Sequence, residues 1–489
     1  MREQVACDLG DLYNPVRANH RLRSLSPRGL LQTMQVENIV GLEGSSSTPP
    51  ADTYLRRRAK GSPFVPAQMR LPHHCAKLHV HFYMKGSVMR GINALAILST
   101  ISMLGSAAGA QGRGGRGTTI QPGEQCPAGT TEIRPRNCMA PEFAPPSIVD
   151  YRPRNTLKVP EHKVPKAKFP AIDYHAHVSQ FLSNAEELAK LGGFMDDLNL
   201  GMMVVADNIS GDRLKSAVAL VKASPKMKDK VRILTGINFR DVGPGWAAKA
   251  VAQLEADVAA GAVGVGEIGK GFGLSTKKAD GTLLKIDDPE LDPVFEAAGR
   301  LNIPVFVHTA EPEEFFQPID FSNERWLELS LFNDRRNGPG TGRPTFDDLM
   351  TQRDNLFKRH PKTKFVAAHM GWHANDLGRL GKMFDAMPNV YAELGAVLYD
   401  IGRQPRAGHD FFVKYQDRIL FGKDSFQPEE YPYYWRVFET KDDYFDYYRN
   451  YHAFWKLYGI DLPDDVLKKV YYKNAMAITP QLPTAGFPK

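Results

Sequence analysis

Two histidines, His175 and His177, stand two residues apart at the end of an apolar run that begins at Ala171. Alternate residues of a β-strand point to the same side, so both imidazoles would face one way. A pair in this position can hold one metal ion, provided that further ligands come from elsewhere in the chain. The spacing therefore predicts one part of a metal site.

Further candidate ligands each follow a short apolar run of their own. His308 ends the run 304–308, His369 ends the run 364–369, and Asp424 ends the run 418–424. A single histidine after a strand is more often a hydrogen-bonded core or loop residue than a ligand. Because the same local context recurs at several strand ends, a shared site is favoured over separate coincidences.

The elements that would carry these residues alternate between short apolar runs and longer amphipathic stretches. Strands are predicted at residues 171–175, 202–206, 231–237, 263–267, 304–308, 364–369, 390–394 and 419–421. Helical periodicity falls between them, at 185–191, 213–222, 246–260, 289–301, 346–359 and 376–387. This alternation predicts an α/β fold, a (β/α)8 TIM barrel over residues 168–480, with catalytic residues at the carboxyl ends of its strands. An open doubly wound sheet is the alternative, but it would bring these strand ends together less naturally.

The strand ends resemble those of the metal-dependent amidohydrolase superfamily, specifically the amidohydrolase-2 branch, which also contains decarboxylases. The resemblance covers residues 168–479 and rests on His175-x-His177, His308, His369 and the segments 419–424 and 470–478. It implies that a divalent ion is bound by four residues, namely His175, His177, His308 and Asp424.

The chemistry of such a site follows from its donor atoms. Neutral imidazoles and a carboxylate suit zinc, manganese or iron(II), and zinc is the expected ion. The ion lowers the pKa of a bound water towards about 7. Asp424 would both touch the ion and accept a proton from the attacking water, while His369 would stabilise an oxyanion or orient the nucleophile. The expected reaction is hydrolysis of a C–N or C–O bond in a small amide, ester or lactone.

The number of ions, one or two, depends on the end of the fourth predicted strand. In two-metal members of the superfamily, His308 and His369 hold a second ion, bridged by a carboxylate or a carboxylated lysine. Glu267 and Lys270 are both candidates for this bridge. The alternative is that Lys270 is a substrate-binding cation that pairs with Glu267, and a single ion is favoured.

Two segments near the expected barrel mouth carry candidate substrate-binding residues. An insertion of about 35 residues after the fifth strand, far longer than usual, contains Arg325 and Trp326, and Arg403 and Arg406 follow the seventh strand. Arginines can clamp a carboxylate through bidentate hydrogen bonds. Packing against the barrel and surface salt bridges are the equal alternatives.

Residues 84–110 have the plan of a secretory signal peptide, with a basic start, an apolar run over 92–104 and small residues up to Ala110. Because such signals begin at the N-terminus, residues 1–83 are interpreted as a misassigned upstream extension, or else as a disordered basic tail. Residues 111–167 would form an extended Gly- and Pro-rich linker. The enzyme is therefore expected to be secreted or periplasmic, without a stable membrane span after cleavage, and its oligomeric state stays open.

Cysteine usage and charge agree with this division. Of the four cysteines, only Cys126 and Cys138 would remain after cleavage, and they are expected to form a disulfide in an oxidising compartment. Residues 171–489 hold 39 Lys and Arg against 44 Asp and Glu, so the net charge of +7 belongs to the leader and linker. The catalytic region thus has no basic surplus for nucleic acid, and a small-molecule substrate is expected.

Two other functions stay open. Decarboxylation of a carboxylated, often aromatic, substrate would use the same metal site and is implied by the resemblance. A non-catalytic barrel that binds a metal or ligand is the third reading. The presence of Asp424 argues against it, because binding alone does not need an acid–base aspartate.

Overall fold

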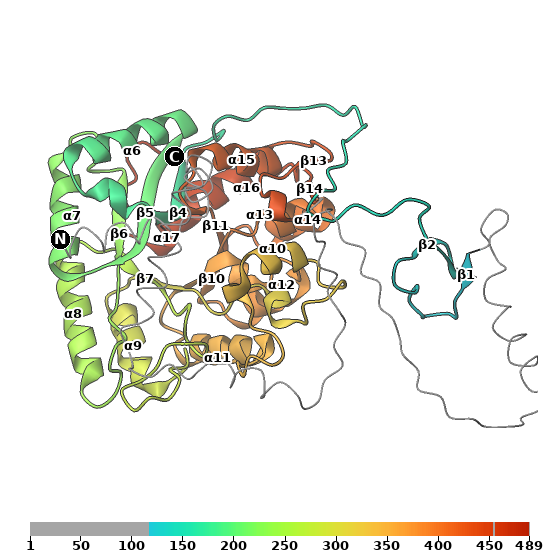
Figure 1. Ribbon diagram of the computed structural model, residues 1–489. Helices are drawn as coiled ribbons and strands as arrows, with labels where there is room; N and C mark the ends of the chain where they lie inside the picture. Colours follow the sequence, from blue (N-terminus) through green and yellow to red (C-terminus); the bar gives the residue numbers. More distant parts are fainter. Residues whose placement is uncertain (1–116, 453–454, 489) are drawn as a thin grey trace, which may run out of the picture. The chain divides into compact units, whose positions relative to one another are not determined.

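The computed structural model describes residues 117–452 and 455–488 (Figure 1). The expected extension at 1–83 and signal peptide at 84–110 lie outside the described residues. Within the predicted linker, a small antiparallel sheet forms from β1 (Thr118–Thr119), β3 (Asn137–Met139) and β2 (Thr131–Arg134), in that order. A disulfide joins Cys126 to Cys138, whose Cα atoms lie 5.6 Å apart, so the predicted pairing is confirmed.

A parallel sheet forms the centre of the catalytic region. Its first seven strands are β4 (Ala171–His177), β5 (Leu200–Ile209), β6 (Val231–Thr235), β7 (Gly264–Ile268), β8 (Val305–Val307), β9 (Phe365–Ala367) and β10 (Val390–Glu393). Each pairs in parallel with the next. These strands fall on the predicted apolar runs.

The eighth barrel strand is divided into two short pieces. β11 (Ile419–Leu420) pairs in parallel with β10, and β12 (Asp424–Ser425) pairs in parallel with β4. Only residues 421–423 separate the two pieces, and the Tyr174 amide donates to the Phe421 carbonyl across the gap. The strand order therefore returns to its starting point, and the predicted TIM barrel is confirmed.

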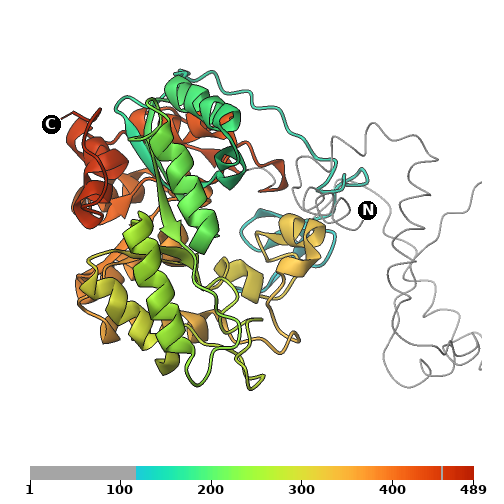
Figure 2. The ribbon, with the colours of Figure 1, turned by 90° about the vertical axis from the view of Figure 1, so that its left-hand side faces the viewer.

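Helices on the outside of the barrel follow the predicted periodicity. They are α6 (Ala185–Leu198), α7 (Gly211–Ala223), α8 (Trp246–Ala260), α9 (Asp292–Arg300), α11 (Phe346–Arg359), α12 (Leu377–Ala386) and α14 (Pro405–Lys414). Asn184 caps α6 by accepting from the Glu187 amide, and a Thr345–Asp348 capping box starts α11. In Figure 2, α6, α7 and α8 face the viewer and cover the outer side of the first strands.

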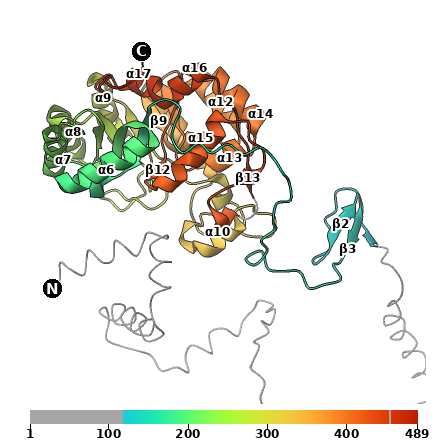
Figure 3. The same ribbon diagram turned by 90° about the horizontal axis from the view of Figure 1, so that it is seen from above.

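Shorter elements lie in the loops and at the C-terminal end. These are α10 (Trp326–Leu331), α13 (Leu398–Gly402), α15 (Tyr431–Glu439), β13 (Phe445–Asp446), β14 (Lys456–Leu457), α16 (Asp464–Lys468), a π-helical turn (Lys469–Lys473) and α17 (Asn474–Ile478). The long insertion after β8 is thus partly helical. Its helix α10 contacts the turn Asn450–His452, and α10 and β13 lie on the same side of the barrel (Figure 3).

Two side-chain contacts fasten the C-terminal helix to the barrel. The Asn474 amide donates to the carbonyls of Gln416 and Ile419, both at 2.7 Å, and thereby holds α17 against β11. The hydroxyls of Tyr174 and Thr479 lie 2.6 Å apart in the core. No helix among the described residues is long and apolar enough to cross a membrane.

Candidate metal centre

Side chains from six strand ends or the turns that follow them meet at one end of the barrel. His175 and His177 come from β4 and Glu267 from β7. His308 follows β8, His369 follows β9, and Asp424 begins β12. The structure thus brings together the candidate ligands that the sequence places at separate strand ends.

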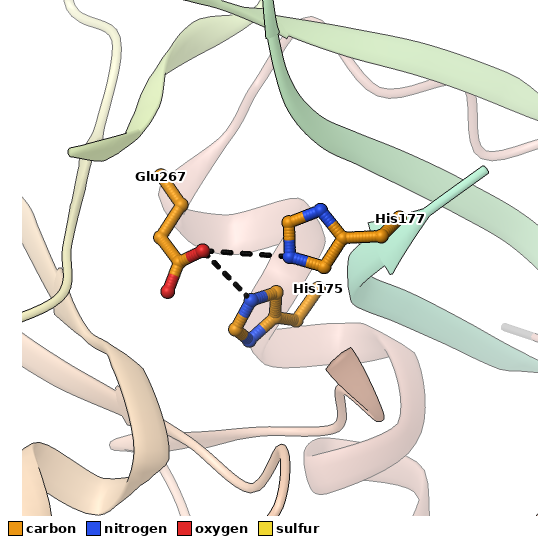
Figure 4. A group of neighbouring side chains, drawn as sticks. All are labelled: His175, His177 and Glu267. Atoms are coloured by element: carbon orange, nitrogen blue, oxygen red, sulfur yellow. Dashed lines mark ion pairs between the residues drawn. The ribbon is translucent and has the colours of Figure 1, made fainter. Parts of the chain in front are cut away.

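Glu267 lies between two pairs of imidazoles. Its Oε2 is 3.4 Å from Nε2 of His175 and 3.4 Å from Nε2 of His177 (Figure 4). Its other oxygen, Oε1, contacts Nδ1 of His308 and lies 3.7 Å from Nε2 of His369. Each carboxylate oxygen therefore serves a different histidine pair.

The outer ring nitrogens of three histidines are held by acceptors. Nδ1 of His175 lies 2.9 Å from Glu393, and Nδ1 of His177 lies 2.8 Å from Asp207. Nδ1 of His369 lies 2.7 Å from the Gly395 carbonyl, which can only accept, so this nitrogen is the donor. With the proton on Nδ1, the lone pair of each Nε2 faces the cluster, as a metal ligand requires.

His308 is oriented the other way round. Its Nε2 donates to the Ala310 carbonyl at 3.1 Å, which leaves Nδ1 towards Glu267. This Nδ1 is 3.2 Å from Nε2 of His369, so the two lone pairs converge on one point. Two neighbouring imidazoles in this arrangement suit a shared cation.

The donor atoms fit a divalent metal. Nε2 of His175 is fully buried and has no hydrogen-bond partner among the described residues, a situation that a coordinated ion would relieve. Burial acts to lower the pKa of His175, but the carboxylates of Glu393 and Glu267 outweigh it and raise the pKa well above the usual value. A metal ion would take the place of the proton that these carboxylates favour. The set His175, His177 and Glu267 and the set Glu267, His308 and His369 each have the nitrogen and oxygen donors of such a site.

Asp424 stands at the open edge of the cluster. Its Oδ1 is 3.4 Å from Nε2 of His177 and 3.9 Å from Nε2 of His175, and a quarter of its side chain is exposed. Burial acts to raise its pKa, but His175 and His369 nearby hold the pKa at about 2. The carboxylate is thus ionised at neutral pH and able to accept a proton.

A family model described as "Amidohydrolase" matches residues 172–478. The chain belongs to the amidohydrolase family. The resemblance inferred from the strand-end residues is confirmed, and the protein is an enzyme of this family.

Solved structures similar to this amidohydrolase share its barrel fold. They include an uncharacterised TIM-barrel protein from Bordetella bronchiseptica (16% identity, TM-score 0.39, covering 64% of this chain and 99% of that chain). A 5-carboxyvanillate decarboxylase from Sphingomonas paucimobilis (14%, 0.38, 64% and 99%) and a 4-oxalomesaconate hydratase from Rhodopseudomonas palustris (16%, 0.37, 64% and 96%) are also similar. A comparison with curated proteins found no match.

The structure separates the two candidate bridging residues of the amidohydrolase. Glu267 enters the histidine cluster, whereas the Lys270 side chain is two-thirds exposed and its Nζ lies 3.7 Å from Glu311. Lys270 is therefore an ammonium beside the cluster. Lys423, directly before Asp424, is buried and paired with Glu430, so it does not approach the histidines.

The residues predicted to bind substrate are placed differently from one another. Arg325 is buried and bound to Glu328 and to the Tyr399 hydroxyl at 2.7 Å each. Arg403 makes two 3.0 Å hydrogen bonds to Glu324. Trp326 is half-buried at the start of α10, and Arg406 is exposed at the start of α14. The first two guanidiniums are engaged by carboxylates of the same chain, and a substrate contact for all four stays a prediction.

Two acidic residues of the site were not identified from the sequence, Asp207 and Glu393. Asp207 accepts from the backbone amides of Val178 and Ser179 as well as from His177. Glu393, fully buried at the end of β10, accepts from the His369 amide at 3.2 Å and from the Gly395 amide as well as from His175. Their position near the carboxyl ends of predicted strands was the only available indication.

We expect Glu393→Gln to weaken metal binding by about 10- to 100-fold, as loss of a carboxylate that orients a ligand does. The carboxylate receives three N–H donors, and an amide has only one oxygen with which to accept them. Metal retained against graded chelator concentrations measures the effect. Glu296→Gln, at an exposed position on α9, is the matched control, and equal chelator resistance in the two variants would contradict the orienting role.

Proposed function

We propose that this amidohydrolase hydrolyses a C–N or C–O bond of a small amide, ester or lactone at a centre of two divalent ions, with zinc as the expected metal. The observation that carries the proposal is the position of Asp424. Its ionised, partly exposed carboxylate borders a cluster of imidazoles whose lone pairs point inward. A base next to a metal site is what activation of water requires.

The residues divide the work between binding and proton transfer. When bound, the ions polarise the substrate carbonyl and lower the pKa of a water molecule. Asp424 accepts the proton from that water and later delivers it to the leaving group. His369 acts as a ligand in this proposal and not as an oxyanion donor, because its one N–H is spent on the Gly395 carbonyl.

The contacts of Glu267 support two ions over one. Its Oε2 approaches the His175 and His177 pair, while its Oε1 approaches the His308 and His369 pair. A carboxylate that offers one oxygen to each of two nitrogen pairs can bridge two cations, and such pairs of ions stand about 3.5–4 Å apart in hydrolases. Glu267 is the bridge in this arrangement and Lys270 is left to meet the substrate.

Metal analysis of the purified protein should find about two divalent ions per chain. The double variant His175→Ala, His177→Ala and the double variant His308→Ala, His369→Ala should each retain about one ion. Far-UV circular dichroism checks that both variants are folded. About one ion in the wild type, with no loss in the second variant, would reduce the centre to a mononuclear one.

Asp424→Asn should lower kcat by about 10²- to 10⁴-fold, because the amide cannot accept the proton, and should leave KM nearly unchanged. Asp212→Asn, on the exposed first turn of α7, is the control. Turnover is measured on a mixed panel of amides, esters and lactones, with metal content matched. Carbon dioxide release from carboxylated phenols, without turnover of the panel, would replace the hydrolase by a decarboxylase.

We also propose that the enzyme works in the periplasm or outside the cell. The Cys126–Cys138 disulfide supports this location, since such bonds persist in oxidising compartments. Cell fractionation and N-terminal sequencing of the native protein test it. The expected mature start is Gln111, and a start within residues 1–83 or a reduced cytoplasmic form would contradict the proposal.

A further inference from the structure

Arg449 differs from the other buried or half-buried arginines near the barrel mouth. Arg325, Arg403 and Arg436 each pair with a carboxylate of the chain. The Arg449 guanidinium has no ion pair and no side-chain hydrogen bond within the described ranges, and its nearest aromatic contact is the Tyr448 ring, 5.6 Å from the centroid. It is therefore a cation without a counter-ion from its own chain.

Phenol hydroxyls surround this guanidinium. The oxygens of Tyr434, Tyr447 and Tyr448 are buried and make no hydrogen bond within the described part of the chain. Tyr434 comes from α15, and the other two directly precede Arg449, with their rings 4.5 Å apart. Buried hydroxyls without partners are rare in folded proteins unless a ligand or water completes them.

These phenols are hydrogen-bond donors at neutral pH. Burial raises the pKa of Tyr434 and of Tyr447 well above the usual value, so both stay protonated. A guanidinium also only donates. The cluster therefore combines N–H and O–H groups with a positive charge, and lacks a matching acceptor.

The cluster lies beside the metal centre. After burial and Tyr447, the carboxylate of Glu393 is among the groups that raise the pKa of Tyr434. After burial, the charge of Arg449 contributes to lowering the pKa of Lys423, the residue before Asp424. These influences place the phenols and Arg449 near the ends of β10 and β12, where the catalytic groups stand.

We propose that Arg449 and the hydroxyls of Tyr434, Tyr447 and Tyr448 bind the carboxylate group of the substrate. This rests on the proposed function for the reaction and deepens it, because it assigns the substrate to the class of amides, esters or lactones that carry a carboxylate. Guanidinium and hydroxyl donors together satisfy both oxygens of such a group. The flanking aromatic rings give its organic part an apolar surface.

The first test measures binding to the full-length, metal-loaded protein by titration calorimetry. The probes are acetate, benzoate and succinate, each compared with its neutral amide. At least one carboxylate should bind more tightly than its amide, and Arg449→Gln should weaken that binding by roughly 10- to 100-fold. Arg449→Lys should lie between the two, and Arg300→Gln, on the exposed side of α9, should bind as the wild type does.

The second test uses Tyr447→Phe, which keeps the ring and removes only the hydroxyl. If the hydroxyl awaits a ligand, this variant binds the carboxylate several-fold more weakly while its Tm is equal to or higher than that of the wild type, because no internal hydrogen bond is lost. A hydroxyl with a purely structural role would show unchanged binding.

Three results would overturn the subsite: no preference of any probe for the acid over the amide, unchanged binding in Arg449→Gln, or unchanged binding in Tyr447→Phe. Loss of binding only in the His175→Ala, His177→Ala variant would assign the carboxylate to the metal instead. Failure of the hydrolase assay with intact Arg449-dependent binding would reject the proposed reaction and leave the subsite standing, so the two failures can be told apart.

Discussion

The site depends on one buried negative charge, the carboxylate of Glu267 between four imidazoles. Burial acts to raise its pKa, but His308 and His175 outweigh this and hold the pKa well below the usual value. A buried carboxylate without a cation is costly, and imidazoles that all direct lone pairs inward cannot neutralise it. The arrangement therefore requires positive charge in the centre, which divalent ions supply.

This requirement explains the polar groups that stand behind the ligands. Asp207, Glu393 and the Gly395 carbonyl each take the outer proton of one histidine and so fix the tautomer that points inward. Space is reserved for Glu393, because a Cβ on Gly422 would lie 2.4 Å from its Oε1. The orienting shell is thus built into the backbone of the last two barrel strands.

The sequence predicted the barrel and five of the clustered side chains, because each ligand ends its own apolar run and a closed parallel barrel gathers such ends. It could not decide between Glu267 and Lys270. The pairing of β7 with β8 shifts register between Val265 and Ile268, so strict alternation fails where it was needed. Asp207 and Glu393 were missed for another reason. Their roles depend on partners elsewhere in the chain, with 218 residues between Glu393 and His175, and a lone acid at a strand end has no distinctive spacing.

The barrel mouth combines two chemically opposite parts. The cluster around Glu267 and Asp424 is rich in acceptors and lone pairs, and it suits cations and the polarised carbonyl that they bind. The group around Arg449 offers only donors and a positive charge. A molecule with a carboxylate at one end and a neutral acyl bond at the other would satisfy both parts in a single orientation. The reverse orientation would place the neutral group against an unpaired guanidinium and leave it uncompensated. The structure thus provides a physical basis for orienting a substrate before the reaction, independent of which acyl bond is broken.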